Sequence, residues 1–314
     1  MSASMHSEHG GPAIHSVHEV VFSAPDLAEA EYFYRAFGLD VRHEGAALAL
    51  YTFGHPHRWA RIYAGARKQL LWLSLGIFEG DGGAFEDKLH SLGIGRAAPP
   101  REAEGEDGRW IDGPDGVPIQ LVVAEKCAPD IKSKRVFPPE TSAAGRAPHR
   151  SEVHAVQPNR LSHVLLFTSD VDAARRFYED VMGLRLSDHS GSIIAFMHGR
   201  HGSDHHLIAL AKSDGAGLHH TSWDVSSLDD VALGSEQMAR AGFAEGWGLG
   251  RHVLGSNYFR YVRDPWGSYA EYSFDIDFIA AGTRWPAADH PPEDALYVWG
   301  PPVPADFVTN HESL

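Results

Sequence analysis

The chain has 314 residues, 22% of them charged and 43% hydrophobic, and its formal net charge is −15 at pH 7. This length suits two domains with sizeable cores, and the composition is typical of globular proteins. The negative charge argues against a nucleic-acid partner, because phosphates need a basic surface. No apolar run has the length of a membrane span, so we also expect no membrane partner.

The chain contains one cysteine, Cys127. An internal disulfide is therefore excluded, and a reducing compartment is indicated. Residues 1–14 lack the basic and apolar segments of a secretory signal, so we expect a cytoplasmic protein. Residues 1–13 are rich in Gly, Ser and His and are predicted to form a disordered leader.

Two segments of the chain follow the same pattern. One runs from His18 to Gly38 and the other from His163 to Gly183, and each histidine lies 20 residues before its glycine. In both, a hydrophobic run is followed by an aspartate and then by a stretch of helical character. Asp at the start and Gly at the end predict a helix after each strand.

The ends of the two segments also correspond. The run Gly-Pro-Asp-Gly at 113–116 leads to Gln120, and the run Asp-Pro-Trp-Gly at 264–267 leads to Glu271 at the equivalent place. The chain is therefore predicted to contain two copies of one unit. A segment rich in Pro, Ala and charge separates them.

The repeat defines the predicted domains. We expect five regions: a leader at 1–13, an N-terminal structural and degenerate domain at 14–125, a linker at 126–159, a C-terminal catalytic metal-binding domain at 160–280, and a C-terminal tail at 281–314.

The second copy gives the clearest element order. Strands are predicted at 161–167, near 193–197, 206–210 and 219–225, and at 258–262 and 269–274, with helices at 171–182 and 228–241. This order corresponds to two βαβββ modules and an α+β fold. Strand alternation predicts that His206, Ile208 and Leu210 share one side, and that Glu271 shares a side with Tyr269.

Glu271 lies in an apolar strand between Ala270 and Tyr272. A carboxylate in this setting is costly unless it is neutralised. His163 and His220 lie in similar strands, and each taken alone would be an ordinary buried histidine. Taken together within a repeat, two imidazoles and one carboxylate form the ligand set typical of non-haem Fe(II) oxygenases.

The order and spacing of this set resemble those of the type I extradiol ring-cleaving dioxygenases, which belong to the vicinal oxygen chelate superfamily. That group includes the 2,3-dihydroxybiphenyl and catechol 2,3-dioxygenases, and the resemblance covers residues 14–279. It rests on His163, His205-His206, His219-His220, His252, Tyr261, the turn at 264–267 and Glu271. The resemblance implies tandem βαβββ modules forming two funnel-like half-barrel domains, with a metal in the second.

The resemblance also implies the metal and the reaction. His163, His220 and Glu271 correspond to the metal ligands of the family, which implies Fe(II), with Mn(II) as the alternative. The activity implied is insertion of both atoms of O2 into a catecholic ring with meta cleavage, in aromatic compound catabolism. The implied partners are a catecholic small molecule and O2, and the family implies a homo-oligomer.

Further residues receive roles from the same resemblance. His206 corresponds to the acid/base histidine, and His252 and Tyr261 to the pair that hydrogen-bonds the substrate hydroxyl. Leu165 and His219 are expected to contact substrate. An imidazole titrates near working pH, which suits an acid/base role.

The first copy departs from this pattern. It keeps His18 but carries Gln120 instead of a carboxylate, and the region equivalent to His220 reads Leu70-Leu71-Trp72. We therefore interpret this half as structural. The tail around residues 299–302, Trp-Gly-Pro-Pro, is expected to cover either the funnel mouth or a subunit interface.

Two other functions remain open from the sequence. One is a glyoxalase-like, metal-dependent lyase or isomerase, which would draw ligands from both halves. The other is a non-catalytic binding protein of the same fold. The set of His206, His252 and Tyr261 lies wholly in the second copy beside one complete ligand triad, which favours ring cleavage.

Overall fold

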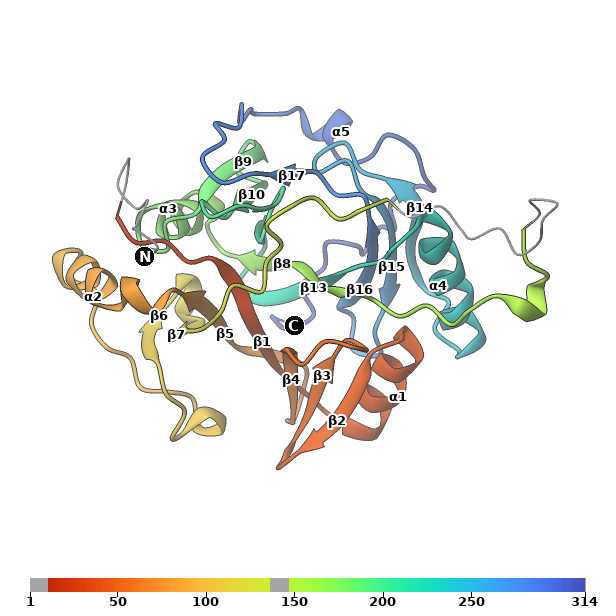
Figure 1. The fold of residues 1–314 in the computed structure, drawn as a ribbon, viewed down its shortest axis with the longest axis horizontal. Coiled ribbons are helices and arrows are strands. Elements are labelled where there is room, and N and C mark those ends of the chain that lie inside the picture. Colours follow the sequence, from red (N-terminus) through yellow and green to blue (C-terminus); the bar gives the residue numbers. More distant parts are fainter. Residues whose placement is uncertain (1–10, 136–146, 314) are drawn as a thin grey trace, which may run out of the picture.

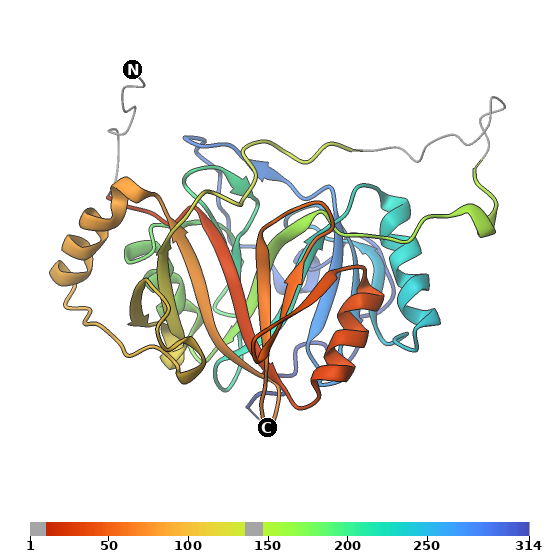
Figure 2. The same cartoon turned by 60° about the horizontal axis from the view of Figure 1, so that its bottom comes forward.

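The computed structural model describes residues 11–135 and 147–313. Most of the predicted leader and the centre of the predicted linker therefore lie outside the described residues. Two open sheets, one from each half of the chain, form the body of the molecule (Figure 1). The C-terminal sheet curls around a central space, and the N-terminal sheet lies against it (Figures 1 and 2).

The N-terminal sheet has seven strands in the order β2-β3-β4-β1-β5-β7-β6. Its elements are β1 (Ser16–Ala24), α1 (Leu27–Phe37), β2 (Asp40–Glu44), β3 (Ala47–Tyr51), β4 (Arg58–Ala64), β5 (Gln69–Ile77), α2 (Gly82–Ser91), β6 (Arg109–Asp112) and β7 (Pro118–Val123). Single 3-10 turns lie at Glu79–Asp81, Arg101–Ala103, Pro114–Gly116 and Arg150–Glu152.

The C-terminal sheet has eight strands in the order β14-β15-β16-β13-β8-β12-β10-β9. Its elements are β8 (Arg160–Thr168), α3 (Val171–Asp180), β9 (Arg185–Ser190), β10 (Ile194–His198), β12 (Ile208–Lys212), β13 (Gly217–Asp224), α4 (Leu228–Arg240), β14 (Gly246–Arg251), β15 (Tyr258–Arg263) and β16 (Tyr269–Phe274). A separate two-stranded ribbon joins β11 (Ser203–Asp204) to β17 (Phe278–Ile279), and α5 (Pro292–Ala295) lies in the tail.

The predicted βαβββ modules are present. In the C-terminal half β8-α3-β9-β10-β12 and β13-α4-β14-β15-β16 each form one, with β11 paired outside the sheet. In the N-terminal half β1-α1-β2-β3-β4 is complete, whereas β5-α2-β6-β7 has one strand fewer among the described residues. The sequence reading missed β9 and β14, because one is polar and the other rich in glycine, and neither composition is typical of a strand.

The two helices that follow the first strand of each half begin as predicted. Asp26 caps α1 by accepting from the amides of Ala28 and Glu29, and Asp170 caps α3 by accepting from the amide of Ala173. These bonds satisfy amides that have no partner within the helix. Each cap therefore fixes where the chain turns from the strand into the helix that covers the sheet.

The pairing of β1 with β5 contains a β-bulge. Val17 pairs with Leu75 and Glu19 pairs with Ser74, so His18 is an extra residue on β1. A bulge redirects the side chain that it contains. His18 therefore does not occupy a regular position on the inner face of this sheet.

The same irregularity occurs in β8, where Ser162 is the extra residue and His163 pairs with Ser222. Glu19 and His163 each lie seven residues before the helix cap and occupy the same place in the strand register. The counterpart of His163 is therefore Glu19, and the prediction that His18 is the retained histidine is wrong. The equal spacing from His18 to Gly38 and from His163 to Gly183 hides this shift. His18 lies one residue further from its helix cap than His163 does, but α1 has one residue more than α3.

The predicted counterpart of Glu271 is confirmed. In β7, Gln120 pairs with Ser74, and in β16, Glu271 pairs with Ser222, with parallel strands in both cases. Two residues before each serine lie Trp72 and His220, so Trp72 takes the place of His220.

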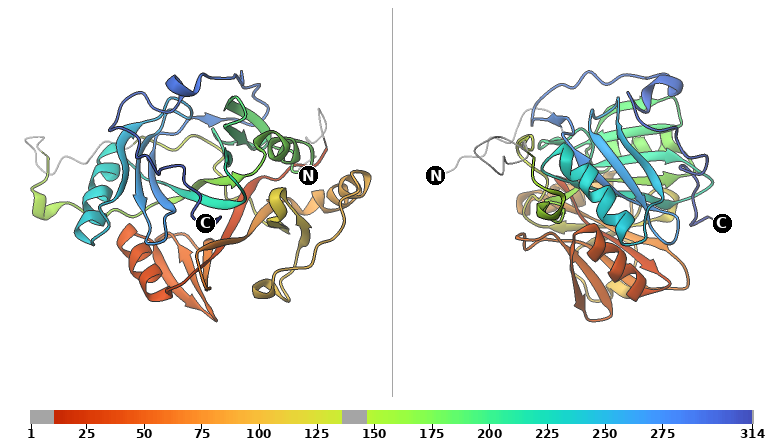
Figure 3. Two further views of the ribbon diagram at one scale, coloured as in Figure 1. Left: turned by 180° about the vertical axis from the view of Figure 1, so that it is seen from behind. Right: turned by 90° about the vertical axis from the view of Figure 1, so that its right-hand side faces the viewer.

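The two halves share one continuous hydrophobic core, to which α1, α3 and α4 contribute. The Phe37 and Tyr272 rings stack at 3.9 Å, and the Tyr272 hydroxyl donates to the Phe37 carbonyl. Lys68 and Asp264 form a buried ion pair between the halves. Figure 3 shows α1 beside α4 at the junction. Within the described residues, no helix is long and apolar enough to cross a membrane.

Candidate metal centre

Three predicted residues meet on adjacent strands of the C-terminal sheet. His163 lies on β8, His220 on β13 and Glu271 on β16, and one ligand atom from each lies within 4.8 Å of the others. Oε2 of Glu271 is 3.3 Å from Nε2 of His163 and 3.6 Å from Nε2 of His220. All three side chains are buried, and Glu271 has no exposed surface.

Two of these atoms lack hydrogen-bond partners in the described part of the chain. They are Nε2 of His220 and Oε2 of Glu271, and both are buried. An unpaired buried polar atom is costly, and unpaired atoms in a native structure point to a missing water or ion. One cation between the three side chains would satisfy both atoms, so the residues present fit a metal.

The hydrogen bonds of His163 set the direction of its free nitrogen. The Ser162 hydroxyl donates to Asp204 at 2.6 Å, so its oxygen accepts from Nδ1 of His163 at 3.2 Å. Asp204 is in turn bound by Arg160 at 2.7 Å. With the proton on Nδ1, the lone pair of Nε2 faces Glu271, as in a metal-binding imidazole.

His220 is held in the same tautomer by a second chain. Nε2 of His219 donates to the carbonyl of Phe307 at 2.7 Å, which leaves Nδ1 of His219 as an acceptor. Nδ1 of His220 lies 2.7 Å from that atom and therefore donates to it. The lone pair of Nε2 of His220 again faces the gap between the three side chains.

His206 lies against His163, with ring centroids 3.9 Å apart. Nε2 of His205 bonds to Asp188 at 2.9 Å, and Nδ1 of His205 lies 3.1 Å from Nδ1 of His206. Because the Nε2–H of His205 donates to Asp188, Nδ1 of His205 is an acceptor, and Nδ1 of His206 is the donor in the second bond. Nε2 of His206 is therefore free for a proton exchange with a molecule in the cavity.

His252 and Tyr261 form a hydrogen-bonded pair at the opposite side. Nδ1 of His252 donates to the carbonyl of Leu296 at 2.8 Å, so Nε2 accepts from the Tyr261 hydroxyl at 2.9 Å. Nε2 of His252 is also 3.9 Å from Oε1 of Glu271. The pair therefore lies beside the three-residue cluster.

Burial keeps His206, His219 and His220 neutral. Burial lowers the pKa of His206 and His220 well below the usual value, and that of His219 to about 4. The neutral imidazole is the form that binds a metal. Burial acts to raise the pKa of Glu271, but the combined effect of its neighbours His163, His252 and Ser222 lowers it.

Seven of the eight predicted site residues line one cavity of about 90 Å³: His163, Leu165, His206, His219, His220, His252 and Tyr261. Glu271 does not line it, but lies beside His163 and His220, which do. Leu165 and Phe196 supply apolar wall, as a site for an aromatic ring requires. Ala295, Leu296, Phe307 and Val308 of the tail also line the cavity, whereas residues 299–302, for which a cover of the funnel mouth or a subunit interface was predicted, do not.

One detail of the strand prediction is wrong. His206 precedes β12, and it lines the cavity, whereas Ile208 and Leu210 belong to the main core. On β12 the cavity side is formed instead by Ala209 and Ala211. The irregular backbone before β12 breaks the alternation that was extended through His206.

Sequence reasoning missed Asn257. Its Nδ2 donates to Oε1 of Glu271 at 3.2 Å and to Oγ of Ser273 at 2.9 Å, and it lines the cavity. An asparagine directly before a strand is typical of a turn. The pairing of β15 with β16, which places it beside Glu271, is not visible in the sequence.

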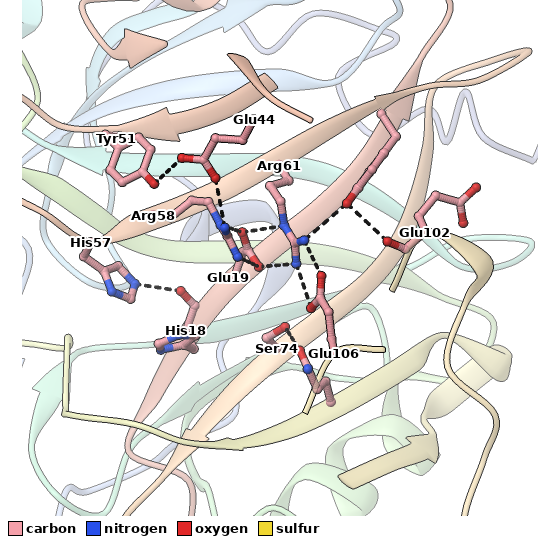
Figure 4. Close-up of polar contacts among 12 residues, drawn as sticks. His18, Glu19, Glu44, Tyr51, His57, Arg58, Arg61, Ser74, Glu102 and Glu106 are labelled. Atoms are coloured by element: carbon pink, nitrogen blue, oxygen red, sulfur yellow. Dashed lines mark hydrogen bonds and ion pairs between the residues drawn. The ribbon is translucent and has the colours of Figure 1, made fainter. Parts of the chain in front are cut away.

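The N-terminal half fills the equivalent place with charged side chains of its own (Figure 4). Glu19 binds Arg61 at 2.8 Å and Arg58 at 2.5 Å, and Arg61 also binds Glu106. Gln120 accepts from the Ser74 hydroxyl, and its Nε2 donates to the carbonyl of Asp107 at 2.7 Å. The carboxylate and the amide at these positions therefore have protein partners.

Comparison with known proteins places this geometry in a family. The model described as Glyoxalase/Bleomycin resistance protein/Dioxygenase superfamily matches residues 160–272. "Metapyrocatechase 2" of Cupriavidus necator is 48% identical over 301 residues, 96% of this chain and 93% of that protein. An "Iron-dependent extradiol dioxygenase" of Rhodococcus jostii is 31% identical over 159 residues, 45% of this chain and 50% of that protein.

Solved structures show the same fold. Homoprotocatechuate 2,3-dioxygenase from Brevibacterium fuscum has a TM-score of 0.75 at 19% identity, over 96% of this chain and 82% of its own. A Mn(II)-bound glyoxalase from Novosphingobium aromaticivorans has a TM-score of 0.73 at 22% identity, over 93% of each chain.

The chain therefore belongs to the extradiol ring-cleaving dioxygenases of the Glyoxalase/Bleomycin resistance protein/Dioxygenase superfamily. The predicted family, fold class and enzyme class are confirmed. The class is metal-dependent, and the proteins named above include an iron-dependent dioxygenase and a Mn(II)-bound glyoxalase of the same fold.

Proposed function

We propose that this extradiol dioxygenase uses Fe(II), held by His163, His220 and Glu271, to cleave a catecholic ring in aromatic catabolism. The observation that carries the proposal is the pair of unpartnered buried atoms, Nε2 of His220 and Oε2 of Glu271, beside an apolar cavity. When bound, Fe(II) in a three-ligand site offers open positions for both catechol oxygens and O2, and acidifies a bound hydroxyl. Iron is favoured over Mn(II) by the name of the Rhodococcus relative.

The protein residues divide the proton transfers between two sides of the cavity. Tyr261 and His252 receive the substrate hydroxyl and take up its proton, because Nε2 of His252 already accepts from the phenol of Tyr261. His206 acts on the opposite side as an acid/base group: its Nε2 takes the proton of the second catechol hydroxyl and returns it to the reacting oxygen. Its neutral ring and its bond to His205 suit a group that exchanges a proton through Nε2.

The substrate is proposed to be a catechol with one ring. The cavity holds about 90 Å³, and Leu296, Phe307 and Val308 of the tail line it. A dry cavity of about 150 Å³ accommodates benzene, so even one ring requires the lining side chains to move apart, and a second ring would require a much larger rearrangement. The full-length similarity to a metapyrocatechase supports the same choice. His219 and Leu165 are proposed to contact the ring.

The enzyme is proposed to work in the cytoplasm as a homo-oligomer. The single cysteine supports a reducing compartment. Val298 and Trp299 of the tail are 61% and 44% exposed, and apolar side chains of this kind favour a subunit contact. Size-exclusion chromatography of the purified protein tests the oligomer.

The reaction is tested on protein purified without oxygen and loaded with Fe(II). We expect oxygen uptake and a coloured ring-opened product with single-ring catechols, and weaker turnover with two-ring substrates. If neither oxygen uptake nor product appears across a panel of catechols, the proposed function is wrong. Turnover of two-ring catechols at equal rates would contradict the proposed substrate size alone.

A further inference from the structure

The N-terminal half contains a second group of metal-ligating side chains. His18, His57 and Cys127 each place one ligand atom within 4.8 Å of the other two. They come from β1, from the loop before β4 and from the segment after β7, far apart in the sequence. The group has no part in the C-terminal site described above.

The first member is the residue that the β-bulge redirects. His18 is the extra residue of β1, so its ring leaves the regular alternation that places Glu19 on the inner face. Nδ1 of His18 is buried and has no hydrogen-bond partner among the described residues. A buried nitrogen without a partner is costly, and a cation would remove that cost.

The second member is held by the first. A ring nitrogen of His57, Nε2, donates to the backbone carbonyl of His18 at 2.8 Å. The two rings lie edge to face with centroids 4.7 Å apart, and Figure 4 shows them beside the Arg58–Glu19 network. A bond from a ring N–H to a backbone carbonyl is a common way to orient a metal-binding imidazole.

The third member is fixed by the backbone. The amides of Cys127 and Ala128 both donate to the Ser16 hydroxyl oxygen, at 3.1 and 2.9 Å. The Cys127 thiol lies 3.5 Å from the carbonyl of Val17. These contacts hold the sulfur beside the residue that precedes His18.

Two cations near the group, Lys126 and Arg58, are neutralised by other partners. Lys126 donates to Asp130 at 2.7 Å and to two backbone carbonyls. Arg58 binds Glu19 and Glu44. A metal ion at this place would therefore not face an unpaired positive charge from these side chains.

We propose that His18, His57 and Cys127 form a second metal site, for a borderline-soft divalent cation of the zinc class. Two imidazoles and one thiolate, completed by water, are a ligand set that suits zinc in a tetrahedral geometry. The thiol proton passes to solvent when the Cys127–metal bond forms, and no electron is transferred. The ion would tie the start of the segment between the halves to β1 and β4.

Cobalt(II) tests the proposal directly, because a thiolate ligand gives an intense near-ultraviolet charge-transfer band. Cys127 is the one cysteine of the chain, so such a band can arise from no other site in it. We expect the band in the full-length protein and its displacement by zinc. Cys127→Ser should abolish it, and Glu271→Gln should leave it unchanged while removing the metal of the other site.

Binding strength and stability give a second measurement. In the Glu271→Gln background zinc should raise the melting temperature, and His18→Gln should weaken zinc binding at least tenfold. His43→Gln, a matched change at an exposed histidine bonded to Glu31, should leave binding unchanged. If Cys127→Ser fails to fold, alkylation of the folded protein before cobalt addition replaces it and should also prevent the band.

The proposal is overturned if saturating cobalt gives no thiolate band, or if zinc leaves the rate of Cys127 alkylation unchanged. A cobalt spectrum without the band would show binding by imidazoles and carboxylates alone. Each of these results leaves the proposed dioxygenase activity untouched, because that activity is measured separately.

Discussion

The same three strand positions carry different side chains in the two halves: Glu19, Trp72 and Gln120 in the first, and His163, His220 and Glu271 in the second. In the first half Arg58 and Arg61 neutralise Glu19, and Gln120 has hydrogen bonds on both sides of its amide. In the second half a nitrogen of His220 and an oxygen of Glu271 remain without a partner. The strand register is shared, and at these three positions only the second half leaves buried atoms that a cation would satisfy.

The two halves also stabilise a buried carboxylate in two different ways. Glu19 is paired with guanidinium groups that the chain itself supplies, one of them buried with it. Glu271 has imidazoles as neighbours, and their low pKa keeps His220 and His206 neutral. A neutral imidazole cannot offset the carboxylate charge, whereas a divalent ion can.

The largest expected effect on activity comes from exchanging the residues at the equivalent positions of Gln120 and Glu271. Glu271→Gln, which installs the residue of the first half, should remove the metal and reduce kcat by on the order of 10³-fold or more, because metal catalysis supplies several kcal/mol. Iron content and oxygen uptake are the measurements.

The reverse change, Gln120→Glu, is the matched control. It places a carboxylate opposite the carbonyl of Asp107, so it should cost about 1–3 kcal/mol of stability and bind no additional metal. If Gln120→Glu gained a tightly bound ion, the side chain at this one position would be enough to explain the difference between the halves, and our account of the first half would be wrong.

His206→Phe tests the division between metal binding and proton transfer. The variant should keep the iron and bind catechol, but lose about 10²–10⁴-fold in kcat, since a positioned acid or base contributes that much. Metal analysis and anaerobic catechol titration separate the two properties. Loss of iron from this variant would instead make His206 a ligand and refute the assignment of His163, His220 and Glu271.

Arg61→Met tests the first half without touching the second. Arg61 and Glu19 are buried together, so removal of the guanidinium should cost about 3 kcal/mol, although Arg58 still pairs with Glu19. Urea unfolding measures this, and activity per folded molecule should not change. Arg96→Met, at an exposed pair with Glu86, should cost less than about 1 kcal/mol. Equal costs for the two variants would show that the buried network is unimportant.

Much of the second half followed from its sequence. The alternating strands, and the helix caps at Asp26 and Asp170 in the two halves, could be predicted because each depends on neighbours along the chain. The grouping of His163, His220 and Glu271 came from spacing that resembles a family, and the structure places them together. The roles of these side chains stay predictions until the variants are measured.

Features that depend on strand pairing between distant segments could not be predicted from the sequence. The bulge at His18 shifted the match between the halves by one residue, because a count along the chain cannot detect an unpaired residue. The place of Asn257 beside Glu271 depends on strand pairing. The tail around Leu296 and Phe307 carries no periodic pattern, although its carbonyls hold two site histidines.

Glu312 near the end of the tail gives the smallest expected effect and tests whether the two halves act as one unit. Its two carboxylate oxygens accept hydrogen bonds from the amides of Leu70, at 2.8 Å, and Leu218, at 2.9 Å. These two residues occupy equivalent positions near the start of β5 and β13. Glu312→Gln leaves an acceptor for one amide and should cost about 1–2 kcal/mol in urea unfolding. Glu293→Gln, an exposed change on α5, should stay within about 0.5 kcal/mol.

The shape of that unfolding curve matters more than its midpoint. Because Glu312 joins equivalent amides of the two halves and the core is continuous, the variant should still unfold in one transition at a lower midpoint. Two separate transitions in Glu312→Gln would show that the carboxylate, rather than the shared core, couples the sheets. The N-terminal half would then support the C-terminal half through a single side chain of the tail.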